Sequence, residues 1–241
     1  MQFLISSKPE IEAAKHLSDL LAKKLLEGRK VLLLLAGGSA EKVYNRIPEF
    51  LSIDDFSNLT VMMGDERWDK DPKHMHADWE MFRETRFHDQ LLKGGASLIN
   101  LLSGGGHQQE AQDFNDELNE YLARSYFTII MLGIGADGHI AGILPASKSM
   151  FSKTFYGNEL AVAHELDTVH PKRITITPGM IKKADEVFVF AVGDKKRNIL
   201  LKLHNVNRQH PNKEWSASIN KCPALILCSQ DVNVYTDQNI V

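Results

Sequence analysis

Short apolar runs recur along the chain, and each ends in a glycine-rich or polar break. The clearest are VLLLLAGGS, LTVMMGDER, SLINLLSGGG, TIIMLGIGADGH and VFVFAVGDKK, and a helix-like segment follows most of them. Runs this short and this apolar are typical of strands that are buried on both faces, as in a parallel sheet. The pattern therefore predicts an α/β fold with a mostly parallel sheet and helices on both of its faces.

The length of 241 residues, 43% of them hydrophobic, is enough to bury one large core. We therefore expect a single α/β domain over residues 1–241. Its first helix is predicted from apolar residues at helical spacing before Gly28, with Pro9 in the first turn and with Ser7 and Glu10 as a capping box.

Three later segments also have a recognisable pattern. HQQEAQDFNDELNEYLAR predicts an amphipathic surface helix with its acidic residues outward, and RITITPGMIKKA predicts a strand and then a helix that opens near Pro178. CPALILC predicts a late buried strand. Such a strand would hold Cys222 and Cys228 about 20 Å apart, too far for a disulfide, so we expect reduced thiols.

Charge and hydropathy exclude some classes of partner. A net charge of −3 without a long Lys/Arg run argues against a nucleic-acid binder. The longest apolar run, VLLLLA, is far shorter than the roughly 20 residues that span a bilayer, and MQFLISSKPE lacks a signal-peptide pattern. We expect a cytoplasmic protein that binds neither nucleic acid nor membrane, as a monomer or a small homo-oligomer.

Polar residues follow four of the apolar runs, at the point where each predicted strand ends. Because the carboxyl ends of parallel strands share one edge of a sheet, ligands bind there, where several loops converge. The candidate residues at this edge are Gly37, Gly38 and Ser39, then Asp65 to Arg67, then Asp137 and His139, and finally Lys196.

The stretch AGGSAEKVY offers backbone N–H groups, the hydroxyl of Ser39 and a predicted helix whose N-terminal end attracts anions. This arrangement suits a phosphate, although a tight strand-to-helix turn would need the same glycines. The Gly-Lys-Ser/Thr ending of a nucleotide P-loop is missing. The sequence therefore leaves two interpretations of this stretch, a tight turn and a phosphate-binding loop.

Three cations are candidate phosphate partners: Arg67 in GDERW, Arg173 in HPKRITIT and Lys196 in GDKK. Each alone has the alternative of an ordinary surface ion pair. Together with the glycine loop they favour a sugar phosphate, and Asp65 would orient Arg67 or receive sugar hydroxyls.

The run GIGADGHIAGILP satisfies the G-x-G-x-x-G spacing, but Pro145 follows too soon for the long helix of a dinucleotide site. We favour His139 as a general base oriented by Asp137, with a structural histidine as the alternative. His74 and His76 would need a third ligand to bind a metal, and none is visible. The simplest chemistry is therefore base-activated water, without metal or cofactor.

In order along the chain, these motifs resemble those of the 6-phosphogluconolactonase family. LLAGGSAEKVY resembles its glycine-rich phosphate loop, MGDERW its Asp-Glu-Arg motif, and GIGADGHIAGILP its Asp-Gly-His signature. RITITPGMIKKADEVFVFAVGDKK resembles its Arg-Ile-Thr strand and Gly-x-x-Lys turn, and CPALIL is similar to its closing strand. The resemblance covers nearly the entire chain.

The resemblance implies a Rossmann-like sheet, shared with glucosamine-6-phosphate deaminases and ribose-5-phosphate isomerases. It also implies hydrolysis of 6-phosphogluconolactone in the pentose phosphate pathway, with His139 activating water against the lactone carbonyl and Asp137 in support. The residues that it places against the phosphate or the sugar are Gly38, Ser39, Arg67, Arg173 and Lys196, with Asp65 in support, and we add Gly37 as part of the same glycine loop.

The chain departs from the family pattern after the Asp-Glu-Arg motif, where lactonases usually carry Ser-Asn and this chain has His76-Ala77 or Ala77-Asp78. Deaminases are the nearest alternative, but they carry a glutamate at the position of Leu144 and a tyrosine at that of Arg67. A sugar-phosphate-binding protein without catalysis is a third hypothesis, motivated by the missing Ser-Asn pair.

Overall fold

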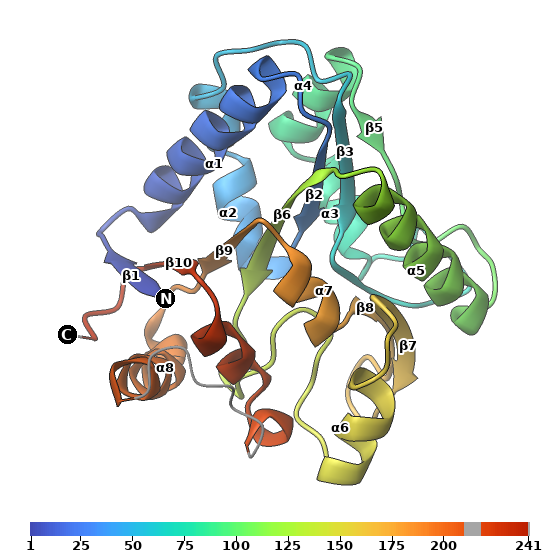
Figure 1. The fold of residues 1–241 in the computed structure, drawn as a ribbon, viewed down its shortest axis with the longest axis vertical. Helices are drawn as coiled ribbons and strands as arrows, with labels where there is room; N and C mark the ends of the chain where they lie inside the picture. The colour runs from blue at the N-terminus through green and yellow to red at the C-terminus, as the bar shows by residue number, and fades with distance from the viewer. Residues whose placement is uncertain (210–217, 241) are drawn as a thin grey trace.

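A seven-stranded parallel sheet forms the centre of the computed structural model, which describes residues 1–209 and 218–240. The strands lie in the order β1-β10-β9-β6-β2-β3-β5, and the neighbouring strands run parallel (Figure 1). Their bounds are β1 Gln2–Ile5, β2 Val31–Leu35, β3 Leu59–Met63, β5 Ser97–Leu98, β6 Phe127–Gly133, β9 Glu186–Phe190 and β10 Val232–Thr236. The predicted α/β fold with a mostly parallel sheet is confirmed.

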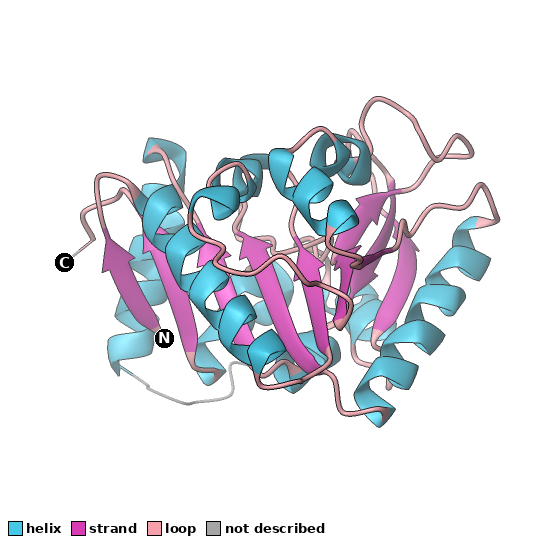
Figure 2. Ribbon diagram, turned by 90° about the horizontal axis from the view of Figure 1, so that it is seen from above, coloured by secondary structure: helices cyan, strands magenta, loops and turns pink. Residues whose placement is uncertain are grey.

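Helices lie on both sides of this layer of strands (Figure 2). β2 and β3 are buried along their whole length, which is why their sequences are unbroken apolar runs. The α-helices are α1 Pro9–Leu26, α2 Glu41–Tyr44, α3 Asp78–Arg83, α4 Arg86–Lys93, α5 His107–Ala123, α6 Lys148–Phe155, α7 Pro178–Lys183 and α8 Arg197–Gln209. The 3-10 segments are η1 Gly38–Ala40, η2 Ile47–Glu49, η3 Asp194–Lys196, η4 Ile219–Lys221 and η5 Pro223–Ser229.

Three short strands form a second, antiparallel sheet that the sequence pattern did not predict. Their order is β4-β8-β7, with bounds β4 Asp65–Arg67, β7 Ala161–Glu165 and β8 Lys172–Ile176. Gly64 separates β3 from β4; its N–H donates to Leu35 O at 2.7 Å, and its carbonyl accepts the N–H of Ile176 at 2.9 Å. Gly64 therefore joins the two sheets. The strand and helix predicted from RITITPGMIKKA are confirmed as β8 and α7.

The N-terminal region differs from the prediction in two ways. Helix α1 begins at Pro9 and ends before Gly28, whose φ of +72° favours glycine, as expected. The capping box is wrong, because the N-cap residue is Lys8 and no side chain caps the helix; the hydroxyl of Ser6 instead accepts the N–H of Lys8. Strand β1 was not predicted, since its partner β10 lies near the other end of the chain.

The segment CPALILC is not the predicted strand but the buried 3-10 segment η5. An apolar run reports burial without distinguishing a strand from another buried segment, and β10 occupies the place beside β9. Because a 3-10 segment rises only about 2.0 Å per residue, the path from Pro223 to Cys228 is shorter than a strand of the same length would be. Both cysteines are free and buried. The N–H of Ala224 donates to Gly138 O at 2.8 Å, so η5 supports the loop after β6.

Helix α5 shows the predicted amphipathic pattern, with Phe114 and Leu118 buried against the core. Glu110 is the exception to the prediction of outward acids, because it is only 3% exposed. Its carboxylate accepts the backbone N–H groups of Ser103 and Gly105 and the indole N–H of Trp68. Glu110 thus fastens the loop before α5 to the residue that follows β4.

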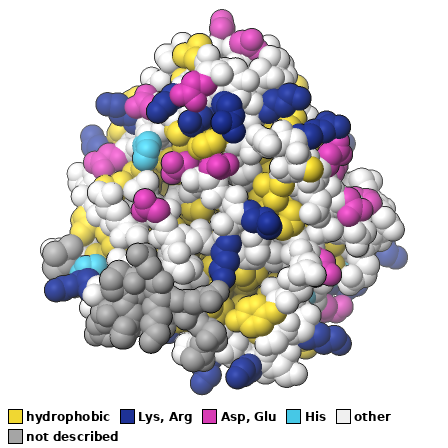
Figure 3. Space-filling view, in the orientation of Figure 1, with side chains coloured by type: hydrophobic (Ala, Val, Ile, Leu, Met, Phe, Trp, Pro, Cys, Tyr) yellow, Lys and Arg dark blue, Asp and Glu magenta, His cyan; other side chains and the backbone are white. Residues whose placement is uncertain are grey.

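The surface carries charges of both signs. Acidic and basic side chains are interspersed over the face shown in Figure 3, in keeping with the net charge of −3. Within the described ranges, no helix combines the length and the apolar character that a membrane span requires.

Gly138→Ala is expected to lower the free energy of unfolding by about 1–3 kcal/mol, because a side chain is strained at its positive φ. Gly138 has a φ of +88°, and an added Cβ would lie 2.8 Å from Cys222 Sγ. Urea unfolding followed by circular dichroism measures the change. Gly133→Ala is the matched control, since a Cβ there meets no described heavy atom within 4 Å. Equal losses in the two variants would contradict the prediction.

Candidate active site

A cleft of about 180 Å³ opens at the carboxyl edge of the parallel sheet, where β2 and β6 end beside the small antiparallel sheet. All the residues predicted for the site line this cleft except Asp137, which lies behind His139. The lining residues are Ala36, Gly37, Gly38, Ser39, Asp65, Arg67, Asp78, Gly133, Ile134, Gly135, His139, Ala141, Arg173 and Lys196. The parallel strands and the small sheet thus bring the distant sequence motifs together at one place.

The glycine loop follows β2, and the side chain of Tyr44 holds its first residue, Ala36. The hydroxyl of this buried tyrosine accepts the N–H of Ala36 at 2.9 Å and donates to the carbonyl of the same residue at 2.8 Å. Gly38 has a φ of +63°, so the turn needs a glycine there. The predicted helix after the loop is short, because η1 is followed by only the four residues of α2. Any favourable interaction with an anion rests on the loop N–H groups and the Ser39 hydroxyl rather than on a long helix.

His139 and Asp137 form a hydrogen-bonded pair in the loop after β6. His139 Nδ1 lies 2.6 Å from Asp137 Oδ1, and because a carboxylate accepts, Nδ1 carries a proton; in the neutral form of the imidazole, Nε2 then has the free lone pair. Partial burial opposes ionisation of Asp137, but the hydrogen bonds and the charge of His139 hold its pKa below the usual value. A Cβ on Gly135 would lie 2.1 Å from His139 Nδ1, so only glycine leaves room for the imidazole.

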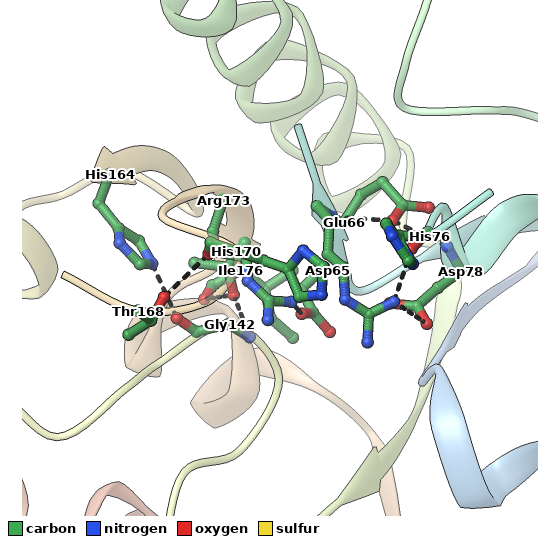
Figure 4. A network of polar contacts seen from close by, with 12 residues as sticks. Asp65, Glu66, His76, Asp78, Gly142, His164, Thr168, His170, Arg173 and Ile176 are labelled. Carbon is green, nitrogen blue, oxygen red and sulfur yellow. Dashed lines mark hydrogen bonds and ion pairs between the residues drawn. The ribbon is translucent and has the colours of Figure 1, made fainter. Parts of the chain in front are cut away.

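The two arginines stand opposite each other across the antiparallel pair of β4 and β8. Arg67 Nη1 donates to Asp78 Oδ1 at 2.8 Å and to the carbonyl of His76 at 2.7 Å. Arg173 Nη1 lies 3.5 Å from Asp65 Oδ2, a longer contact (Figure 4). Each guanidinium therefore has its own carboxylate, which offsets the repulsion between the two positive charges.

Imidazole groups hold the backbone of both arginines. His74 Nε2 lies 2.9 Å from the carbonyl of Arg67, and His107 Nε2 lies 2.9 Å from that of Arg173. Because a carbonyl only accepts, each Nε2 carries a proton and donates it. His74 is thus engaged in holding β4. Among the described residues, no group of three or more His, Cys, Asp or Glu side chains is arranged to hold a metal.

Burial changes the acid–base properties of the cleft walls. Burial, together with the charge of Asp78, raises the pKa of Asp65 to about 6, against the opposing effect of Arg173 and Arg67. Burial lowers the pKa of Lys196, and the charge of Asp137 opposes that change. Burial of Asp65 therefore disfavours its charged form.

Glu66 lies between Asp65 and Arg67 in β4; its two neighbours line the cleft, whereas Glu66 itself is fully buried. One of its carboxylate oxygens accepts the N–H groups of Arg67 and Asp78, at 2.8 and 2.9 Å, and the other accepts the N–H of Trp79 at 2.8 Å. Burial and the charge of Asp78 raise its pKa to about 8, although the three N–H donors act in the opposite direction. Glu66 thereby ties the start of α3 to β4.

Asp78 is the charged residue in the lining of this cleft that sequence reasoning did not place there. It is 3% exposed and lines the cleft beside Arg67. The only sequence signal was the departure of Ala77-Asp78 from the family's Ser-Asn pair. The loop of His139, in contrast, behaves as expected: the next helix, α6, begins only at Lys148, so the glycine run opens no dinucleotide-binding helix.

Comparisons with known proteins identify the family of the chain. A family model described as "Glucosamine-6-phosphate isomerases/6-phosphogluconolactonase" matches residues 8–230. The human GDH/6PGL endoplasmic bifunctional protein is 31% identical over 110 residues, which are 46% of this chain but only 13% of that protein. The glucosamine-6-phosphate deaminase of Staphylococcus haemolyticus is 26% identical over 231 residues, covering 83% of this chain and 92% of that enzyme.

A solved structure shows the same fold. The 6-phosphogluconolactonase from Shewanella baltica is 22% identical and matches with a TM-score of 0.75, over 98% of this chain and 96% of that chain.

Glu66→Gln is expected to destabilise the protein by about 1–3 kcal/mol at pH 5, because an amide NH₂ cannot accept one of the three buried N–H groups. The difference from wild type should shrink as the pH rises toward 8. The unfolded carboxyl ionises near 4.5 and the folded one near 8, so wild type loses stability over this window as pH rises. Urea unfolding at several pH values measures both effects.

Glu84→Gln, at an exposed position just after α3, is the matched control for this measurement. A difference between Glu66→Gln and wild type that stays constant from pH 5 to pH 8 would mean that Glu66 is ionised in the folded protein throughout.

Proposed function

Because the chain belongs to the family of glucosamine-6-phosphate isomerases and 6-phosphogluconolactonases, we propose that it hydrolyses 6-phospho-D-glucono-1,5-lactone to 6-phosphogluconate in the pentose phosphate pathway. The observation that carries the proposal is the His139–Asp137 pair at a cleft that also holds Arg173, Lys196 and a glycine loop. The ligand is the phosphorylated lactone, and the reaction needs neither a metal nor a cofactor.

The phosphate is assigned to the loop of Gly37 to Ser39 and to the cations of the cleft. Arg67 and Arg173 already have carboxylate partners, and these reduce their net charge. Lys196 has no carboxylate at ion-pair distance among the described residues, so it is the cation most able to gain a new anionic partner. Charge-assisted hydrogen bonds of this kind are about twice as strong as neutral ones.

Catalysis is assigned to His139 as general base. A water molecule attacks the lactone carbonyl carbon, and Nε2 of His139 takes its proton while Asp137 stabilises the resulting imidazolium. The bond between this carbon and the ring oxygen then breaks, the ring oxygen receives the proton from the imidazolium, and the carboxylic acid that forms loses its own proton to solvent to give the carboxylate. General-base assistance of this kind contributes about 10²- to 10⁴-fold, and positioning of the lactone adds to it.

Deamination of glucosamine 6-phosphate is the second candidate, because a deaminase aligns with most of this chain. The deaminase signature places a glutamate where this chain has Leu144, a buried side chain that cannot transfer a proton. Release of ammonia from glucosamine 6-phosphate, without turnover of the lactone, would favour the deaminase over the lactonase.

We take residues 1–241 as one catalytic domain that acts in the cytoplasm, as a monomer or a small homo-oligomer. Light scattering after gel filtration measures the oligomeric state.

His139→Ala is expected to lower kcat by about 10²- to 10⁴-fold, because the general base is removed. The affinity for 6-phosphogluconate should change little, since the imidazole is not assigned to the phosphate. The lactone is generated in place with a dehydrogenase, and rates are measured above spontaneous opening at fixed pH.

His204→Ala, on α8 and outside the cleft lining, is the control. An active His139→Ala variant would remove this residue from its assigned role. Binding of 6-phosphogluconate without any turnover by wild type would favour the third hypothesis, a sugar-phosphate-binding protein without catalysis.

Lys196→Ala is expected to raise KM by about 10- to 100-fold with a small change in kcat, because hydrogen bonds to charged groups contribute about 1.5–3 kcal/mol. The same coupled assay measures it. Lys195→Ala is a matched control, because Lys195 is the exposed neighbour in η3 and does not line the cleft. Equal effects of the two substitutions would show that only the general positive charge of this region matters.

A further inference from the structure

A second cavity adjoins the candidate active site. It has a volume of about 420 Å³ and lies between the segment that follows β4 and the turn that joins β7 to β8; residues 67–70, 74 and 76 and residues 169–172 line it. Among the residues that the structure describes, Arg67 alone lines both this cavity and the cleft of His139. We call this cavity the outer pocket, and the proposed reaction gives it no role.

Positive charge predominates in the outer pocket. Lys70 and Lys172 line it together with Arg67, whereas Asp69 is the one acidic residue of its described lining. Arg67 already pairs with Asp78 in the cleft. The ion pairs of the described residues include neither lysine. The outer pocket therefore holds two ammonium groups that have no carboxylate at ion-pair distance in the described part of the chain.

Two imidazole groups lie side by side in the same pocket. The ring centroids of His76 and His170 are 4.9 Å apart (Figure 4), and no described residue forms a hydrogen bond with either ring. His74 differs, because its Nε2 donates to the carbonyl of Arg67 at 2.9 Å and its Nδ1 accepts the N–H of His76 at 3.3 Å. His74 thus has no ring nitrogen left for a ligand. His76 and His170 are the imidazoles that can still bind one.

The surroundings of His170 favour its neutral form as long as no anion is bound. Burial, and then the charges of Arg67 and Arg173, lower the pKa of this imidazole, with smaller contributions from His76 and His74. An anion among these groups has the opposite effect, because a nearby negative charge favours the imidazolium. Each imidazolium then offers the anion a charged N–H donor. Binding of an anion is therefore coupled to uptake of a proton, and it strengthens as the pH falls.

We propose that the outer pocket binds a doubly charged tetrahedral oxyanion, either free phosphate or the phosphate group of an ester, between the two lysines and the imidazoles of His76 and His170. The cations without carboxylate partners match the charge of such a group, and the ammonium and imidazole N–H groups match its acceptor oxygens. The outer pocket is larger than the cleft, so it has room for the uncharged part of an ester. The inference goes beyond the proposed function and does not depend on it.

Proton NMR titration of the imidazole groups tests the proposal at single residues. Sulfate is the probe, because it has the shape of phosphate and keeps both of its charges over the whole titration. Saturating sulfate should raise the pKa of the His170 imidazole by about 1, the size of shift that a nearby opposite charge produces. Sodium chloride at equal ionic strength is the control for screening and should produce a smaller shift. The resonances of His204, on α8 and outside the outer pocket, should not respond. His76→Gln and His170→Gln assign the two resonances.

A matched pair of lysine variants tests the charge of the pocket. Lys70→Gln should weaken sulfate binding by about three- to tenfold, because one unit charge a few ångströms from the anion is lost. Lys73→Gln is the control, since Lys73 is an exposed lysine of the same segment that does not line the outer pocket. The response of His170 to sulfate should persist in Lys196→Ala, whose substitution lies in the cleft.

Two further ligands at fixed pH identify the source of the phosphate group. Tighter binding of glucose 6-phosphate than of inorganic phosphate, followed at the His170 resonances, identifies an ester, and any other order identifies the free ion. Equal shifts of His170 in sulfate and chloride would overturn the proposal. So would loss of the response in Lys196→Ala, or equal losses in Lys70→Gln and Lys73→Gln. Because the titration needs no turnover, lactone hydrolysis without a sulfate response would reject the outer pocket and keep the proposed reaction. A sulfate response without hydrolysis would do the reverse.

Discussion

The antiparallel pairing of β4 with β8 is the constraint on which the candidate site depends. It places Arg67 opposite Arg173 at the edge of the parallel sheet, so that two positive charges face one cleft. Two guanidinium groups at neighbouring positions repel each other unless carboxylates accompany them. Asp78 and Asp65 fill that need, and imidazole N–H groups of His74 and His107 hold the two backbone carbonyls. The cations are thus held in place before any ligand arrives.

The opposite wall of the cleft depends on support from the end of the chain. The loop of Asp137 and His139 turns tightly through glycines, and the N–H of Ala224 in η5 binds the carbonyl of Gly138. Gly135 leaves room for the imidazole, and Asp137 sets its tautomer. A general base works only when its free nitrogen is held at a defined place. The C-terminal segment therefore contributes to the site without lining the cleft.

The buried carboxyl groups of Asp65, Glu66 and Asp78 reduce the stability of the fold but fix the geometry of the site. Glu66 is fully buried and accepts three backbone N–H groups, so it orders the start of α3, yet burial makes its ionisation costly. Asp65 and Asp78 add two more carboxylates within the same small region. Buried acids are retained where their geometry is needed, because an apolar side chain could not align Arg67 or the N–H groups of α3.

From the sequence alone, the glycine loop, Arg67, Lys196 and the His139 loop could be placed at one edge of a parallel sheet, whereas the place of Arg173 depends on the unpredicted pairing of β8 with β4. The reason is that buried parallel strands are read as unbroken apolar runs, and the residues after them necessarily share an edge. Local pattern could not show that β1 pairs with β10, or that CPALILC is a 3-10 segment, because both depend on which distant segment takes the place beside β9. It also could not show Asp78 against Arg67 and Gly37. Those contacts join three separate segments, and only the tertiary packing of α3 on β4 brings Asp78 within hydrogen-bond distance of Arg67 and against Gly37.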